Sequence, residues 1–204
     1  MNKLFTQIQK AEPVAFGGFS ELYIIDGKAV KLLEDACYLD VLEESYRQNL
    51  AAEAGLAPKI YTVTRMNDQV VVVMDVIDND VWYHADAGGD VAPTLIGELC
   101  KEEMQHGLRL FCELLRANLV HADFHTGNFF MNDKGETLAI DFGIASELHE
   151  APTKHLKRAV QFMLPALEQL GFTDQAVDLF DAYHTGDDDT LREALAETAL
   201  AVLS

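Results

Sequence analysis

The strongest constraint on the fold is a β-hairpin predicted over residues 21–33. Two short runs rich in aliphatic residues, ELYII and KAVKLL, flank the dipeptide Asp26-Gly27. An Asp-Gly pair readily adopts the positive φ angles of a two-residue hairpin turn, so this arrangement is a strong short-range hairpin signal. The N-terminal third of the chain is therefore expected to form an antiparallel sheet.

The segments around the hairpin extend it to a β-β-β-α-β-β order. The strand-rich region begins near Ala15. Apolar residues recur at three- and four-residue spacing over residues 36–54, which predicts a helix that is closed by Gly55. A second hairpin is predicted from residues 60–64 and 70–77, around a short polar turn.

The second half of the chain is predicted to be mainly helical. Residues 78–93 are rich in Asn, Asp and Gly, which is typical of a linker between two lobes. A compact turn at residues 120–127 is followed by a third predicted hairpin, formed by residues 129–131 and 137–140. Helices are expected over residues 95–116, 154–170, 173–183 and 188–202.

The net charge narrows the class of partner. The 204 residues include 15 Lys and Arg against 34 Asp and Glu, which gives a formal charge of −19. A surface this acidic repels phosphate backbones and anionic lipid headgroups over most of its area. Nucleic acid and membranes are therefore not expected as partners, and any phosphate must be bound locally. The hydrophobic fraction of 49% is that of a folded globular protein.

The cysteines and the N-terminal residues predict a cytoplasmic protein. Cys37, Cys100 and Cys112 are odd in number and form no Cys-x-x-Cys motif, so neither a disulfide framework nor a zinc site is expected. The first residues lack the apolar core of a signal peptide, and no stretch approaches the ~18 apolar residues of a membrane span. A secreted effector is not indicated, because the folded pattern begins by Ala15.

Three side chains have the pattern of a phosphoryl-transfer site. Residues 121–128 read HADFHTGN, and the tripeptide DFG follows the third hairpin at residues 141–143. Phosphoryl transfer from ATP needs a carboxylate near the acceptor hydroxyl and oxygen ligands for the Mg²⁺ that bridges the phosphates. Asp123 suits the first role, and Asn128 and Asp141 suit the second. An isolated His-x-Asp usually caps a turn, but the ordered match of all three favours a catalytic loop and a metal motif.

These motifs resemble those of the protein-kinase-like superfamily over about residues 15–144. The His-x-Asp-x-His-x-x-Asn loop is similar to the loops of atypical and small-molecule kinases, such as lipopolysaccharide-sugar kinases, ABC1-type kinases, and aminoglycoside or choline kinases. The resemblance implies an α+β, two-lobed fold, with a five-stranded antiparallel N-lobe that carries one helix and a short, mainly helical C-lobe. It divides the chain into an N-lobe at residues 1–77, a hinge or linker at 78–93, and a reduced C-lobe with the catalytic loop at 94–204.

The resemblance also assigns phosphate-binding residues in the N-lobe. Gly17 and Gly18 lie in a degenerate glycine-rich loop, where small residues let backbone N–H groups approach phosphates. Taken alone, this segment is equally compatible with an ordinary strand turn. Lys31, in the sequence Ala-Val-Lys, resembles the strand lysine that pairs with the α- and β-phosphates. Its alternative role is that of an edge-strand charge.

A carboxylate partner and a hinge complete the N-lobe assignments. The helix partner of the lysine should be a glutamate, for which Glu44 is favoured over Glu43 and Glu53. Met74, at the end of a valine-rich strand, would be the gatekeeper, and Asp75 would begin the hinge whose backbone groups bind adenine. The four valines are equally those of a buried strand, and both interpretations hold together.

Two residues depart from the usual protein-kinase loop. Ala122 stands where an Arg would receive a phosphorylated activation loop, so activation by that route is not expected. His125 stands where many protein kinases keep a Lys, so it would either touch the γ-phosphate within the catalytic set or order the loop. No Ala-Pro-Glu closes an activation segment and the chain ends at residue 204, so a minimal kinase fold is expected.

The leading functional prediction is an ATP- and Mg²⁺-dependent phosphotransferase that acts on a hydroxyl acceptor. A minimal protein Ser/Thr kinase is preferred because of the kinase-like N-lobe and the DFG tripeptide. A kinase for a sugar, an aminoglycoside or a choline-like molecule is the alternative. A pseudokinase that only binds is less favoured, since it has no need of a base such as Asp123. At a charge of −19 the surface favours a basic protein substrate or a cationic small molecule.

Overall fold

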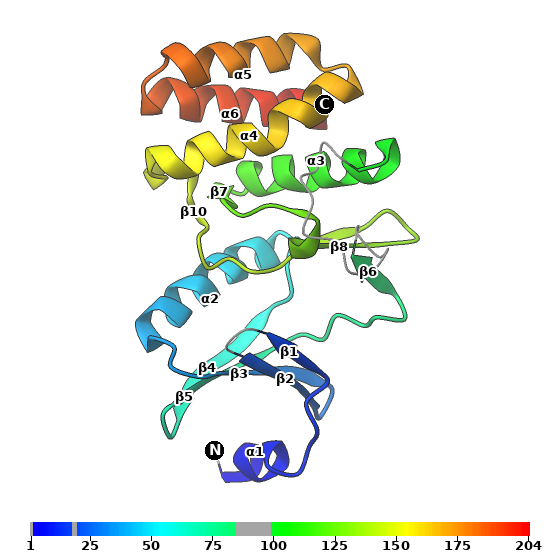
Figure 1. Cartoon of the computed structure of the whole chain (residues 1–204), viewed down its shortest axis with the longest axis vertical. Helices are drawn as coiled ribbons and strands as arrows, with labels where there is room; N and C mark the ends of the chain where they lie inside the picture. Colours follow the sequence, from blue (N-terminus) through cyan, green and yellow to red (C-terminus); the bar gives the residue numbers. More distant parts are fainter. Residues whose placement is uncertain (1, 18–19, 85–98) are drawn as a thin grey trace.

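The computed structural model describes residues 2–17, 20–84 and 99–204, and it has two lobes (Figure 1). A five-stranded antiparallel sheet and a long helix form the N-lobe, and a group of packed helices forms most of the C-lobe. The long helix, α2 (Tyr38–Glu53), lies between the sheet and the C-lobe helices. The predicted α+β, two-lobed fold is confirmed.

The strands of the N-lobe sheet pair in the order β1-β2-β3-β5-β4, all antiparallel. The predicted hairpin turn joins β2 to β3, where Asp26 and Gly27 have φ angles of 51° and 74°. Gly and Asp tolerate this left-handed region better than most residues. The strands are β1 (Ala15–Gly17), β2 (Ser20–Ile25), β3 (Lys28–Leu33), β4 (Ile60–Met66) and β5 (Gln69–Met74).

Helices cover both faces of the sheet. The short helix α1 (Asn2–Ile8), which was not predicted, packs its last residue against a cluster that includes Val30 and Leu32. On the other face, α2 packs against residues of β4 and β5. Successive residues of a strand point to opposite faces. Lys31, between Val30 and Leu32, therefore points to the face that α2 covers.

The C-lobe helices follow the predicted pattern with one change at a helix start. Helix α3 begins at Lys101 rather than near residue 95, because Cys100 has an extended backbone with a ψ angle of 160°. Residues 95–98 lie outside the described part of the chain. The helices are α3 (Lys101–Arg116), α4 (Thr153–Leu170), α5 (Thr173–Thr185) and α6 (Asp188–Leu203). Over the described residues, no helix is long and apolar enough to cross a membrane.

Short strands and turns connect the two lobes and flank the loop at residues 121–128. Within the predicted linker, β6 (Trp82–His84) pairs with β8, and residues 85–93 lie outside the described part of the chain. The third predicted hairpin is present as the pair β8 and β9. The remaining elements are β7 (Leu119–Val120), the 3₁₀ turn η2 (Thr126–Asn128), β8 (Phe129–Asn132), β9 (Thr137–Ala139), β10 (Ser146–Glu147) and the 3₁₀ turn η3 (Leu148–Glu150).

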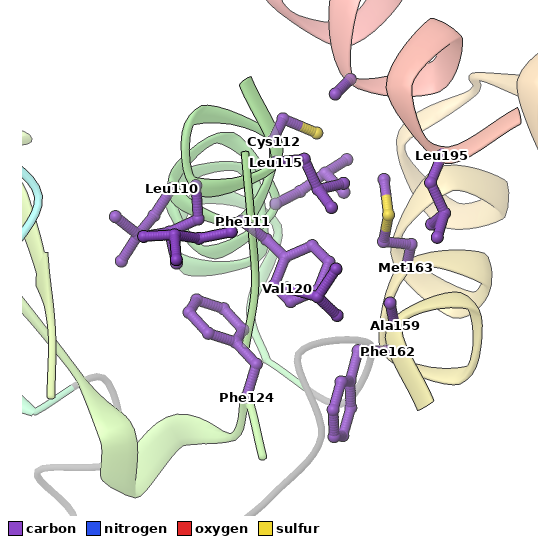
Figure 2. Packing of buried hydrophobic residues seen from close by; sticks show 14 of the residues in the cluster. Leu110, Phe111, Cys112, Leu115, Val120, Phe124, Ala159, Phe162, Met163 and Leu195 are labelled. Carbon is purple, nitrogen blue, oxygen red and sulfur yellow. The ribbon is translucent and has the colours of Figure 1, made fainter. Parts of the chain in front are cut away.

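Phe124 anchors the loop at residues 121–128 in the C-lobe core. Its ring is fully buried, and its centroid lies 4.9 Å from that of Phe111 on α3. Phe111 in turn contacts Phe162 of α4, and Figure 2 shows the core continuing to Met163 on the same helix. Burial of a side chain of this size contributes about 2–3 kcal/mol. Because Phe124 directly follows Asp123, this packing fixes the position at which the Asp123 carboxylate projects from the core.

Candidate functional site

His121 is the buried anchor of the candidate catalytic loop (residues 121–128). Its side chain is 1% exposed, with Nε2 located 2.9 Å from the carbonyl oxygen of Ile140. The backbone N–H of Asp123 donates to Nδ1 at 3.4 Å. Burial lowers the pKa of His121, so the ring is neutral and its Nε2–H donates to Ile140. Through these two hydrogen bonds the ring connects Ile140, the residue before Asp141, to the backbone of Asp123, the candidate base. His121 was not predicted as a site residue, although the first His of the His-x-Asp motif signals it.

Asp123, His125 and Asn128 meet at the open side of this loop. Nδ2 of Asn128 donates to the backbone carbonyl of Asp123 at 2.9 Å and lies 3.2 Å from Nε2 of His125. Nε2 of His125 is 3.9 Å from Oδ2 of Asp123. The Asn128 side chain is buried, whereas the Asp123 side chain is 40% exposed. The loop therefore buries the amide of Asn128 and exposes the carboxylate of Asp123 to solvent.

His125 has a clear structural role in ordering the loop. Its Nδ1 accepts a hydrogen bond from the N–H of Gly127 at 3.1 Å and caps the η2 turn. Such a cap satisfies an N–H that the first turn of a helix leaves without a backbone partner. The other ring nitrogen, Nε2, lies 3.9 Å from Oδ2 of Asp123. Of the two roles predicted for His125, this geometry supports loop ordering.

Asp141 lies beside Asn128 through a backbone connection. The N–H of Ile140, the residue before Asp141, donates to the carbonyl of Asn128 at 2.9 Å. This hydrogen bond brings the two predicted metal ligands to the same side of the candidate catalytic loop. Asp141 is exposed and has a φ angle of 60°. Its Oδ1 accepts from the N–H of Gly143 at 3.4 Å. Phe142, which lies between Asp141 and Gly143 in the sequence, has a fully buried ring whose centroid is 5.0 Å from that of the His121 ring. This packing anchors the tripeptide.

Glu44 is the helix carboxylate that faces the site. Burial raises the pKa of Glu44, Lys31 opposes this rise, and the negative charge of Asp141 adds to it. A Cβ placed on Gly143 would lie 3.8 Å from Glu44 Oε2, so the DFG backbone runs next to this carboxylate. Glu43 is turned away: its exposed carboxylate pairs with Arg47 at 3.1 Å. The arrangement therefore supports Glu44 over Glu43 as the partner of Lys31.

Replacement of Glu44 by Gln is expected to stabilise the protein above the raised pKa of Glu44. Because the folded state disfavours the charged carboxylate, the free energy of unfolding falls as pH rises from the unfolded value, near ~4.3, through the raised folded value. Thermal unfolding against pH should show this fall in the parent and not in Glu44→Gln. The same variant should weaken ATP binding by up to about fivefold, because Lys31 loses a charge partner worth ~1 kcal/mol.

Glu43→Gln is the matched control, since it makes the same chemical change on the exposed side of α2. It should leave both the pH profile and ATP binding as in the parent. If Glu43→Gln, and not Glu44→Gln, weakened ATP binding, the assignment of Glu44 would be wrong.

The predicted adenine-binding residues lie at the end of β5. Met74 is the last residue of the strand and pairs with Ala29 of β3, which is buried. The N–H of Asp75 donates to the carbonyl of Lys59 at 2.9 Å, and its carboxylate binds Lys28 at 2.9 Å. If Asp75 binds adenine as predicted, its carbonyl is therefore the backbone group that it would offer.

The predicted glycine-rich loop lies at the β1–β2 turn. Gly17 ends β1 and pairs with Ser20 at the start of β2. Gly18 lies outside the described residues. Gly17 lies on the edge strand of the sheet, and its role in phosphate binding stays a prediction.

The donor set at the DFG end of the site fits Mg²⁺. Asn128 uses Nδ2 in its hydrogen bond to the backbone carbonyl of Asp123, which leaves Oδ1 as the ligand atom it offers. The exposed carboxylate of Asp141 accepts one long hydrogen bond, from the N–H of Gly143 at 3.4 Å. One carboxylate and one amide oxygen suit Mg²⁺, which takes its other ligands from phosphates and water. The described residues contain no group of three or more His, Cys, Asp or Glu that would hold a metal by itself.

Arg158 is a charged neighbour of Asp123 that was not predicted. Its Nη2 lies 4.0 Å from Oδ1 of Asp123, whereas His125 approaches the other carboxylate oxygen, Oδ2. Arg158 belongs to α4, which begins at Thr153, well after the DFG tripeptide. Its sequence neighbourhood contains no motif, so only the packing of α4 beside the loop discloses the contact.

The comparison with protein families decides the class of this fold. Residues 44–166, more than half of the chain, match the model of the ABC1 atypical kinase-like domain. The chain belongs to the ABC1 atypical kinase-like family. The match contains Glu44, the candidate catalytic loop and the DFG tripeptide, whereas Lys31 and the predicted glycine-rich loop precede the matched region. No curated protein matches the chain individually.

Proposed function

We propose that this ABC1 kinase-like protein is a phosphotransferase that transfers the γ-phosphoryl group of ATP to a hydroxyl acceptor in the presence of Mg²⁺. One observation carries the proposal: the loop presents the exposed carboxylate of Asp123 on the same side as Asn128 and Asp141, the two predicted metal ligands. Lys31 and Glu44, on the facing lobe, supply a cation and its carboxylate near the DFG backbone. A module that only bound nucleotide would not need an outward-facing base.

In the proposed reaction, Asp123 accepts the proton of the acceptor hydroxyl. The acceptor oxygen forms a bond to the γ-phosphorus, the bond from phosphorus to the β–γ bridging oxygen breaks, and ADP leaves. The hydrogen bond from Asn128 to the backbone of Asp123 holds the base at a fixed position. Lys31 offsets negative charge on the α- and β-phosphates. When bound at Asn128 and Asp141, Mg²⁺ would neutralise charge on the phosphates.

Two acceptor classes are consistent with this site. A Ser or Thr hydroxyl of a protein is the first candidate, because the N-lobe carries the strand lysine, helix glutamate and hinge positions of a protein kinase. A small-molecule hydroxyl is the second candidate, favoured by the short segment between Gly143 and the start of α4 at Thr153. At long range the charge of −19 favours the approach of a basic protein or a cationic small molecule.

The test is transfer of label from γ-labelled ATP, with the purified protein alone, with a cell lysate and with a panel of metabolites. Label should appear on an acceptor only with Mg²⁺ or Mn²⁺ present, and separation by size then assigns the acceptor class. Label on protein bands supports the first candidate, and label only in small molecules supports the second. If ATP binds with a metal ion but no label leaves it under any condition, the protein is a binding module.

A further inference from the structure

A basic pocket lies next to the candidate base in an otherwise acidic molecule. It has a volume of about 380 Å³. Its cations are Lys154, Lys157 and Arg158, three of the chain's 15 Lys and Arg residues, all on one turn and a half of α4. Ile144, directly after the DFG tripeptide, and Tyr183 of α5 form other parts of its wall. We call this feature the α4 pocket.

The α4 pocket is joined to the site through Arg158. The guanidinium lines the pocket, and its Nη2 also lies 4.0 Å from Oδ1 of Asp123. Ile144 gives a second connection, because it follows Gly143 in the chain. A molecule seated in the pocket therefore lies beside the carboxylate that would accept a hydroxyl proton.

The charges in the α4 pocket are available to a ligand. Within the described part of the chain, no carboxylate lies within 4.0 Å of the ammonium of Lys154 or Lys157. Both lysines are exposed, and Lys157 lies over the ring of Tyr183 at 5.3 Å. No Asp or Glu occurs in the sequence between Glu150 and Glu168. Arg158, although near Asp123, is 48% exposed.

The surroundings of His155 agree with a positive local potential. His155, which also lines the pocket, has its pKa lowered by burial and by the positive charges of Lys154, Arg158 and Arg47. Arg47 lies on α2, so cations from both lobes act at this point. The acidic exterior does not cancel this field, because exposed charges more than ~10 Å away are largely screened at physiological salt.

We propose that the α4 pocket binds an anionic group, a phosphate or a carboxylate, on the acceptor and so presents the acceptor hydroxyl to Asp123. This inference rests on the proposed function and adds the substrate class: a hydroxyl compound that already carries a negative group. The pocket volume lies at the lower end of those of small-molecule sites, which suits one anionic group with a short carbon skeleton. An acidic side chain next to a Ser or Thr in a peptide offers the same chemistry.

The charges of the α4 pocket and the net charge of the molecule favour different acceptors. Net charge governs approach over distances near the Debye length, but contact charges govern the bound complex. A basic protein or a cationic small molecule would place its charge against Lys154, Lys157 and Arg158. Such an acceptor is expected to be disfavoured at the site itself.

The first experiment measures binding of glycerol 3-phosphate to the full chain, with glycerol as the uncharged probe. The protein is saturated with Mg²⁺ and the non-hydrolysable analogue AMP-PNP, so that phosphate cannot occupy the nucleotide site. Lys154→Glu/Lys157→Glu should weaken glycerol 3-phosphate binding by at least about tenfold, which corresponds to 1.4 kcal/mol. Glycerol should not show saturable binding to either protein.

Lys10→Glu/Lys101→Glu is the matched control, since it changes the net charge by the same amount on exposed lysines that do not line the α4 pocket. Its affinity for glycerol 3-phosphate should stay within about twofold of the parent, because distant exposed charges are screened. Equal weakening by both double variants would show a net-charge effect and overturn the pocket. Absence of saturable glycerol 3-phosphate binding to the parent would overturn it as well.

A second arm compares label transfer to glycerol 3-phosphate and to Ser peptides flanked by Glu or by Lys. We expect transfer to one or both anionic acceptors, and loss of that preference in Lys154→Glu/Lys157→Glu. Preference for the Lys-flanked peptide would overturn the inference. Affinity for Mg·AMP-PNP is measured for every variant and should be unchanged. If the parent does not bind Mg·AMP-PNP, the proposed function fails. Binding of glycerol 3-phosphate in the absence of nucleotide still tests the α4 pocket in that case.

Discussion

Replacement of Asp123 by Ala is expected to reduce turnover by about 10²–10⁴-fold, the usual contribution of a general base, with Mg·ATP affinity unchanged. The Asp123 side chain is 40% exposed, and among the described residues its carboxylate contacts only His125 and Arg158, at 3.9 and 4.0 Å. The hydrogen bond that holds Asn128 goes to the backbone carbonyl of Asp123, which Ala retains. The loop and its metal ligands should therefore survive the substitution, and only the base is lost.

The measurement pairs steady-state turnover with calorimetric binding of Mg·ATP. Asp133→Ala is a suitable control, because it removes an exposed carboxylate from the neighbouring β8–β9 turn. Thermal unfolding should place both variants close to the parent. Turnover of Asp123→Ala equal to that of the parent would remove Asp123 from the mechanism.

Local sequence patterns predicted most of the fold and the centre of the site. The Asp26-Gly27 turn specifies its hairpin through backbone angles alone, and the apolar periodicity of residues 154–170 and 173–183 places α4 and α5 to within two residues. Asp123 and Asn128 lie on one loop, so their spacing already determines that they meet. Such features are visible because every interaction involved is short in sequence.

Features that depend on rotation or on packing between distant segments were not predictable. Glu43 and Glu44 differ by about 100° around the helix axis, and only the placement of α2 against the sheet decides which faces Lys31. The approach of Arg158 to Asp123 depends on how α4 packs beside the loop, 35 positions away in sequence. The short helix α1 is held by its contact with the sheet, since isolated helices of this length are not stable in water.

Substitution of Asp141 should have the largest effect on nucleotide binding, because it removes the only carboxylate assigned to the metal. Asp141→Asn is the cleaner variant. The residue has a φ angle of 60°, which Asn tolerates and which costs Ala roughly 1 kcal/mol. Asp141→Asn should therefore unfold like the parent, whereas Asp141→Ala should be slightly less stable. Both should lose turnover by at least about 10²–10³-fold, the scale of one preorganised electrostatic group.

The specific readout is the metal dependence of ATP binding, since a ligand to Mg²⁺ acts only when the metal is present. With Mg²⁺, the parent should bind ATP more tightly than either variant, and with EDTA the three proteins should bind it alike. A second readout follows from the charge of Asp141, which contributes to the raised pKa of Glu44. Loss of this charge should move the pKa of Glu44 back towards its ordinary value, measurable by NMR titration of the side-chain carboxyl. An unchanged affinity for Mg·ATP in Asp141→Asn would show that this carboxylate does not hold the metal, even if the Glu44 titration shifts as expected.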